Sequence, residues 1–253
     1  MKCELRLDLK RLVGYRVSFI SDLVIFASII VTTFLSGLDR AFANAFDTSD
    51  MTGKMLVLIG FICWQIASTG LGWSANNIRG QMTSGTFELK MQSQFPVELM
   101  LFIEMLTYLL VSFISLTCFF IIFLLIIGGG ILQIVYIPLT YLVAFPGVLG
   151  MFGIGLILGG VSLREKNIGN LVFILQTAMI FVSDFIDVRR RGFNIIPFNA
   201  AIKIMRSVYL SRPVHYTHIL DYLLVNIAWV LIGIFVFRSF LATERKKGAF
   251  DTY

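Results

Sequence analysis

Two histidines are the first residues in this 253-residue sequence that could bind a metal or transfer a proton. His215 and His218 are three positions apart, so a helix would place both rings on one face. A zinc site needs at least a third ligand and a reason for a metal at that place. We therefore expect the pair to face solvent or lipid headgroups, and we predict no metal site.

Motifs of nucleotide binding and of serine hydrolysis are absent from the sequence. No Gly-x4-Gly-Lys-Ser/Thr loop occurs, so this chain does not hold nucleotide phosphates in the P-loop manner. No Gly-x-Ser-x-Gly turn occurs either, and neither histidine lies in an apolar run where it could activate a serine. The sequence therefore predicts that the chain is not an enzyme and carries no cofactor of its own.

Ionisable side chains are almost absent from the apolar runs. Such residues mark proton and ion routes in transporters. Asp22 and Glu104 lie near expected cytoplasmic ends of apolar runs, where they can reach interfacial water. We therefore do not expect coupling to a proton or sodium gradient. The cysteines, Cys3, Cys63 and Cys118, show no metal or disulfide pattern and are interpreted as packing residues.

The composition requires a membrane around the elements that position these residues. Hydrophobic residues make up 57% of the chain and charged residues 14%, and a soluble fold of this length could not bury so much apolar surface. The net charge is +6 and the pI about 9.3. Since the cations flank apolar runs, anionic lipid headgroups are the expected counter-charge, and no nucleic acid is expected as a partner.

Six apolar runs approach the roughly 20 residues that a helix needs to cross a bilayer. They are 17–35, 55–75, 99–127, 136–161, 168–185 and 219–241. Pro138 and Pro146 are candidate kinks in the fourth run. The sequence therefore predicts an all-α integral membrane protein with about six transmembrane helices, residues 17–253, after an N-terminal interfacial segment, residues 1–16.

The segment 1–16 has the pattern of an amphipathic helix lying on the inner leaflet, with a basic face beside an apolar stripe. The stripe consists of Leu5, Leu9, Leu12 and Val13. Lysines and arginines also follow the second and fourth runs and the last run, so both termini are expected in the cytoplasm. The triplet Arg189, Arg190 and Arg191 would lie outside, against this rule. The expected location is a plasma membrane, of a bacterium.

Two connecting segments are expected to fold as more than loops. Between the second and third runs, Gly85 and Thr86 offer a helix start, and Glu88 suits the positive end of the helix dipole. Side chains at every fourth position then form a stripe that needs a covering surface: Phe87, Met91 and Phe95. The second segment, about 186–218, is apolar but broken by prolines, and is expected to form short re-entrant helices on the outer side.

The segment 79–89, with Gly85-Thr86-Phe87-Glu88 at its centre, resembles the Gly-Thr-Leu-Glu signature of type-2 ABC exporter permeases. The signature lies between the second and third spans in that family, as it does here. The amphipathic N-terminal helix, six spans and re-entrant helices followed by an arginine, here Arg206, also resemble the family. This sequence has Phe87 at the leucine position and lacks the Asn of the Asn-Pro pair before Pro197.

The resemblance implies a coupling helix, about 84–96, that docks in a groove of a separate cytoplasmic ATPase, where ATP and Mg would bind. It implies a second permease copy or a paralogue, and membrane lipids around the dimer. The ATPase-coupling residues would be Gly85, Thr86, Phe87, Glu88, Met91, Phe95, Arg164 and Glu165. The translocation path would lie between spans two and five, with Trp64, Gln65, Thr69, Phe173, Gln176 and Thr177, although simple helix packing is the competing interpretation.

The function expected from this resemblance is export of a hydrophobic or amphiphilic cargo, such as a drug, an antimicrobial peptide or a lipid. The 24 phenylalanines and the scarcity of charge suit such cargo, but aromatic residues are also common filling in membrane proteins. A lipid-linked glycan is the alternative cargo. A membrane-embedded lipid-modifying enzyme and a non-catalytic immunity or assembly protein are the alternative classes.

Overall fold

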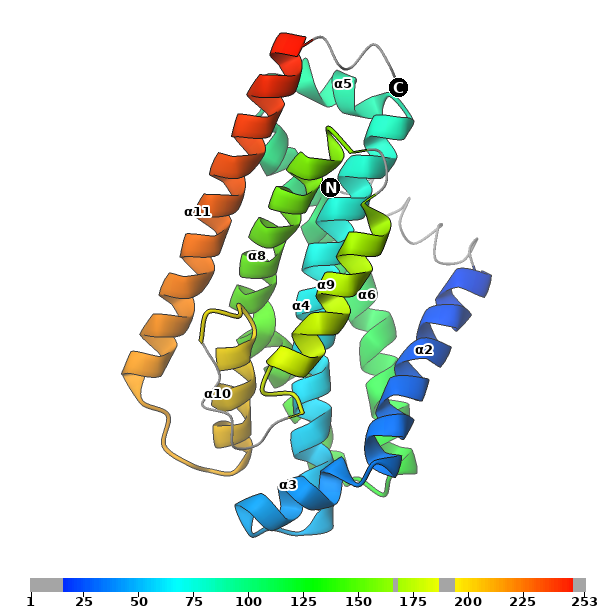
Figure 1. Ribbon diagram of the computed structural model, residues 1–253. Helices are drawn as coiled ribbons and strands as arrows, with labels where there is room; N and C mark the ends of the chain where they lie inside the picture. The colour runs from blue at the N-terminus through cyan, green and yellow to red at the C-terminus, as the bar shows by residue number, and fades with distance from the viewer. Residues whose placement is uncertain (1–15, 166–167, 187–193, 248–253) are drawn as a thin grey trace.

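The computed structural model describes residues 16–165, 168–186 and 194–247. Within these residues the secondary structure is entirely helical, with turns and short connections between the helices (Figure 1). The expected interfacial segment before residue 16 and the arginine triplet 189–191 lie outside the described residues. In chain order the helices are α2 (Arg16–Leu35), α3 (Leu38–Phe46), α4 (Asp50–Thr83), α5 (Thr86–Met91), α6 (Val97–Ile126), α7 (Ile131–Ile134), α8 (Tyr136–Ser162), α9 (Gly169–Val182), α10 (Asn199–Tyr209) and α11 (Tyr216–Lys247).

Each of the six apolar runs forms a helix, but not every helix is long enough to span a bilayer. By length and composition, α4, α6, α8 with α7, and α11 qualify, and α2 with α3 would add a fifth span bent by 57°. Helix α9 has 14 residues. At 1.5 Å per residue it covers about 21 Å, short of the roughly 30 Å of a hydrocarbon core. The membrane class is therefore supported with four to five candidate spans, and the predicted count of six is not confirmed.

The breaks between helices lie where the sequence provides turn residues. Gly37 between α2 and α3 and Gly85 between α4 and α5 adopt left-handed φ angles of 74° and 70°, which side chains other than glycine rarely adopt. Ser49 caps α4 by accepting a hydrogen bond from the Thr52 amide at 3.3 Å. Pro96 directly precedes α6, where its missing N–H removes no helix bond.

Helix α8 continues through Pro146 because a side chain from another helix repairs its hydrogen bonding. Pro138 lies in the first turn, where no amide partner is required. At Pro146, the amide of Gly147 donates to the Tyr222 hydroxyl at 2.7 Å, and that hydroxyl donates to the Val143 carbonyl at 3.0 Å. The tyrosine from α11 is thus inserted into the broken backbone ladder of α8.

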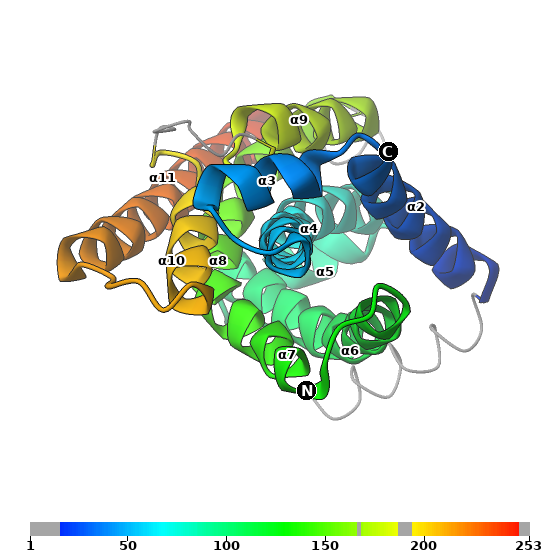
Figure 2. The same cartoon turned by 90° about the horizontal axis from the view of Figure 1, so that it is seen from below.

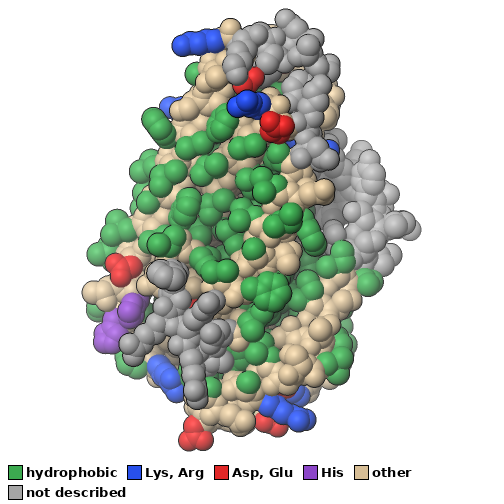
Figure 3. All heavy atoms as spheres, viewed as in Figure 1, with side chains coloured by type: hydrophobic (Ala, Val, Ile, Leu, Met, Phe, Trp, Pro, Cys, Tyr) green, Lys and Arg blue, Asp and Glu red, His purple; other side chains and the backbone are tan. Residues whose placement is uncertain are grey.

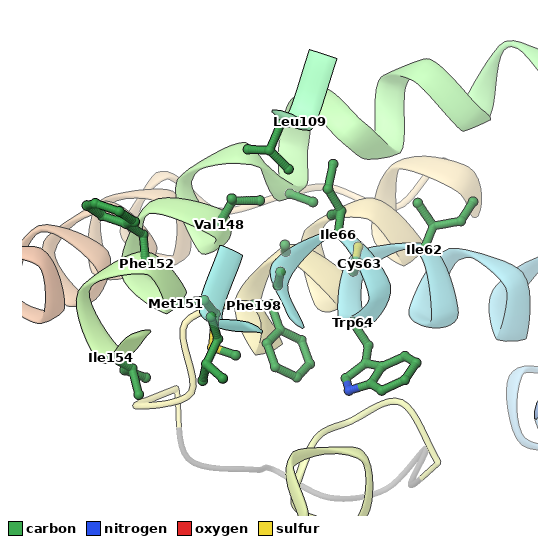
Figure 4. Close-up of a cluster of buried hydrophobic side chains, with 14 of the residues drawn as sticks. Ile62, Cys63, Trp64, Ile66, Leu109, Val148, Met151, Phe152, Ile154 and Phe198 are labelled. Atoms are coloured by element: carbon green, nitrogen blue, oxygen red, sulfur yellow. The ribbon is translucent and has the colours of Figure 1, made fainter. Parts of the chain in front are cut away.

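Helix α4 lies at the centre of the bundle and is buried along almost its whole length (Figure 2). Its largest contact is with α8, and α8 in turn packs on α11. The glycines of α8 permit both contacts: a Cβ on Gly155 would overlap the Ser74 side chain of α4, and one on Gly153 would overlap the backbone of α11. Figure 4 shows the apolar side chains that α4, α6 and α8 contribute to this core, together with Phe198.

The bundle has two ends with charged residues and an apolar middle. The space-filling view shows hydrophobic side chains over the middle of the visible face, and charged residues toward the ends (Figure 3). The helices α4, α6, α8 and α11 run along the bundle in alternating directions, while α2 and α9 cover only part of its length, each running toward the end that holds α3 (Figure 1). We call the end with α5 and the last turns of α11 the α5 end, and the end with α3 and α10 the α3 end. This distribution of polarity fits a protein that crosses a bilayer.

Candidate functional site

The segment predicted as a coupling helix, 84–96, contains a helix, but that helix is shorter than predicted. Helix α5 spans Thr86–Met91, starts directly after Gly85, and ends at the Gln92 cap. A six-residue helix is not stable alone in water, so contacts with the bundle must hold it. It lies at the α5 end, in contact with both α4 and α6 (Figure 1).

The three apolar side chains expected to share one face of this helix do not do so. Phe87 is fully buried within this chain, and Met91 packs at the edge of the same core. Phe95 is 66% exposed because the helix has already ended at Met91, so the period of four no longer applies. Phe87 therefore needs no second protein to cover it. The exposed side chains of α5 and its flanks include Glu88, Leu89 (68%) and Phe95.

Polar side chains also connect α5 to α6 and α4. Glu104 of α6 forms an ion pair with Lys90 of α5, and the two side chains are only 21% and 14% exposed. The second carboxylate oxygen of Glu104 accepts hydrogen bonds from Asn77 at 3.1 Å and from Gln81 at 3.0 Å, both on α4. We call these four residues the Glu104 cluster. It joins three helices at the α5 end.

The remaining predicted coupling residues follow α8 at the same end. Arg164 and Glu165 are both exposed. Residues 166 and 167 of the expected loop lie outside the described residues. A second ion pair at this end joins α6 to α11, with Arg238 donating to Glu98 at 2.8 Å.

Two of the six predicted path residues meet between α4 and α9. The indole N–H of Trp64 donates to the Gln176 carbonyl at 3.3 Å, and the Gln176 amide donates to the Ser68 carbonyl at 2.8 Å. These bonds close the α4–α9 contact. A Cβ on Gly72 would lie 2.6 Å from the Gln176 side-chain amide nitrogen, so the Gln176 side chain lies directly over this glycine.

The other four path residues do not converge on that contact. Gln65 is buried, and its carbonyl accepts the Thr69 hydroxyl at 2.9 Å within α4. On α9, Phe173 is 68% exposed and Thr177 is half-buried. In the single chain, Trp64 and Gln176 are helix-packing residues, while Phe173 lies on an outward face.

Arg206, which entered the sequence argument only through the resemblance, is a central residue of the α3 end. Its guanidinium donates to the carbonyls of Leu56, Asp184 and Phe185 at 3.0, 2.8 and 3.3 Å. It also stacks on Phe42 of α3, 4.3 Å from the ring centroid. Burial lowers the pKa of Arg206 to about 10, so it remains charged at neutral pH. One side chain thus joins α10, α4 and α3.

The two histidines are exposed in the single chain, as the sequence suggests. His215 and His218 are exposed, with ring centroids 5.9 Å apart, just before and within the first turn of α11. Among the residues that the structure describes, no group of three or more His, Cys, Asp or Glu side chains could hold a metal ion.

Sequence reasoning did not anticipate the Glu104 cluster or the Tyr222 bridge. Asn77 and Gln81, four residues apart near the end of an apolar run, were a usable signal, because polar pairs on one helix face usually share a partner. Comparison with known proteins adds no further guide: no family model, curated protein or solved structure matches this chain.

Proposed function

We propose that this chain is the membrane-spanning permease subunit of a type-2 ABC exporter, driven by ATP hydrolysis in separate cytoplasmic ATPase subunits. The observation that carries the proposal is α5. This short helix interrupts the path from α4 to α6, is anchored through Phe87 and Lys90, and leaves Glu88 and Leu89 exposed at the end of the bundle. A helix held rigidly to a membrane bundle, with a free outer face, is suited to receive a force from a partner.

The arrangement of the other elements supports the same proposal. Six helices alternate in direction, α10 lies between α9 and α11 at the opposite end from α5, and the basic C-terminal turns of α11 lie at the α5 end. In this proposal the α5 end is cytoplasmic, both termini are cytoplasmic, and α9 completes six spans with local thinning of the bilayer or with help from a second copy.

The proposed cargo is hydrophobic or amphiphilic, and a lipid-linked glycan is the alternative. The path would run between the α4 and α9 faces of two copies. The outward-facing Phe173 of α9 would then line it, while Trp64 and Gln176 would hold α9 against α4.

The first experiment is purification of the tagged protein from its native membrane in mild detergent, followed by an ATPase assay and identification of co-purifying chains. A stoichiometric ATPase is the expected result. The isolated chain without ATPase activity, under conditions that preserve known transporters, would contradict the proposal and favour the enzyme or immunity-protein class.

The docking surface can be tested in the same purification. We expect Glu88→Arg and Leu89→Ala to lower recovery of the ATPase at least about tenfold, because a few residues that become buried at an interface carry most of its binding energy. The bundle should stay folded, since both side chains are exposed. Ser84→Ala, at an exposed position just before α5, is the control and should leave recovery unchanged. Full recovery with both α5 variants would exclude α5 as the docking helix.

A further inference from the structure

The Glu104 cluster connects α5 to two long helices through side chains that are mostly shielded from water. Lys90 lies on α5, Asn77 and Gln81 lie on α4, and Glu104 lies on α6. Glu104 is seven residues beyond Val97, which places it about 10 Å along α6 from the start of that helix. The carboxylate therefore lies within the bundle, and Lys90 reaches inward to meet it.

Glu104 is the shared acceptor of the three donors in this cluster, Asn77, Gln81 and Lys90. One carboxylate oxygen accepts from Asn77 and Gln81, which are one helical turn apart on the same face of α4. The other oxygen pairs with Lys90. A displacement of α5 that kept the ion pair would move Glu104, and with it α6 and the end of α4.

Apolar packing alone gives α5 a single deep anchor. Phe87 is fully buried, but Leu89 points to solvent and the helix has only six residues. Met91 packs only at the edge of the core. Lys90, three residues along the helix from Phe87, adds a polar attachment that reaches α6 and, through Glu104, α4.

We propose that the Glu104 cluster is the link through which movement of α5 is passed to α4 and α6, with Lys90 and Glu104 as positioning residues for coupling. This inference rests on the proposed function, because it requires a partner that moves α5. It separates two roles within one short helix: Glu88 and Leu89 contact the partner, and Lys90 passes the movement into the bundle.

The test uses the co-purified complex of the full chain with its ATPase, in lipid nanodiscs with ATP and Mg. We compare Glu104→Gln, Lys90→Met and the charge exchange Lys90→Glu with Glu104→Lys. The single variants should retain the ATPase subunit at wild-type stoichiometry. The stimulation of ATP hydrolysis by the membrane subunit should fall about tenfold, which is a typical size for coupling between two sites. The charge exchange should restore a substantial part of it.

The matched control is Glu98→Gln, which removes another buried carboxylate of α6 at the same end. Glu98 pairs with Arg238 of α11 and has no role in attaching α5, so this variant should keep full stimulation. Lys90→Met retains the apolar stem of the lysine and guards against loss of folding in the Glu104 variant.

Three results would overturn the inference. Wild-type stimulation in both single variants would show that the cluster passes no movement. Equal losses in Glu98→Gln and Glu104→Gln would indicate a general loss of stability at this end. A wild-type preparation without an ATPase would overturn the proposed function itself, and the link with it, before any variant is compared.

Discussion

Single residues hold this bundle together where the backbone is irregular. Tyr222 bridges the gap in α8 at Pro146, and Arg206 binds the Asp184 and Phe185 carbonyls at the break that follows α9. In both places a buried backbone acceptor would otherwise have no donor in an environment with little water. The side chains therefore replace secondary structure at positions where the helices end or are interrupted.

Replacement of Arg206 by methionine should destabilise the protein strongly. The variant leaves the carbonyls of Leu56, Asp184 and Phe185 without this donor in a buried site, at a cost of about 3 kcal/mol or more. For a chain of this size the thermal midpoint should fall by roughly 6 °C or more. Thermal unfolding in detergent measures the change.

Arg212 provides the matched control, because it also stacks on a phenylalanine of α3. Its guanidinium lies 5.0 Å from the Phe46 ring, but the residue is exposed. Arg212→Met should change stability by less than about 1 kcal/mol. Equal effects of the two variants would mean that cation–π stacking, and not carbonyl binding, accounts for the role of Arg206.

Long-range partners explain why such residues were hard to predict. The sequence singles out Arg206 only through a resemblance, since its acceptor on Leu56 is 150 positions away. Tyr222 was not singled out at all, because its position in an apolar run is typical of ordinary packing. By contrast, the exposure of the histidine pair could be interpreted from neighbours in the sequence alone.

The sequence predicted the long helices correctly, but it did not predict the length of the short helix α5 or which of its side chains are covered. The long apolar runs gave the cores of α4, α6, α8 and α11, because apolar length alone determines them. The period-four stripe at Phe87, Met91 and Phe95 was a poor guide because α5 ends after six residues. The contact of Gly155 and Gly159 of α8 with α4 depends on which helices are neighbours in space, and the structure shows it directly.

The α4–α8 contact gives a prediction at the scale of elements. A Cβ at Gly155 would overlap the Ser74 hydroxyl and lie 2.8 Å from the Leu71 carbonyl, so α4 and α8 would have to separate. Gly155→Ala should therefore destabilise the bundle by about 1–3 kcal/mol, as overpacking of cores does. Gly80→Ala, in α4 with nothing within 4 Å of the added methyl, should be neutral or slightly stabilising. In thermal unfolding, the midpoint of Gly155→Ala should fall several degrees below that of the wild type. The midpoint of Gly80→Ala should stay at or slightly above the wild-type value.

The distribution of lysines and arginines predicts how the molecule is oriented in the membrane. The described lysines and arginines at the α5 end outnumber those at the α3 end, and one of the latter, Arg206, is buried. The positive-inside tendency therefore predicts a cytoplasmic α5 end.

Labelling of single cysteines in intact cells tests both this orientation and the status of α9. In a chain with Cys3, Cys63 and Cys118 replaced, Leu89→Cys and Glu165→Cys should resist a membrane-impermeant maleimide, whereas Tyr216→Cys should react, because Tyr216 is 90% exposed at the opposite end. Inverted membrane vesicles should reverse the pattern. A cytoplasmic α3 end would reverse both results.

The decisive position for the span count is Tyr216, which follows both α9 and α10 and is 90% exposed. If α9 crosses the bilayer despite its 14 residues, Tyr216→Cys reacts in intact cells and Glu165→Cys does not. The bilayer must then thin around α9, or a neighbouring copy must cover its ends, because about 21 Å of helix cannot span roughly 30 Å of hydrocarbon unaided. If both variants instead react only in inverted vesicles, then α9 turns back within the membrane, and the even span count on which the proposed permease topology depends is lost.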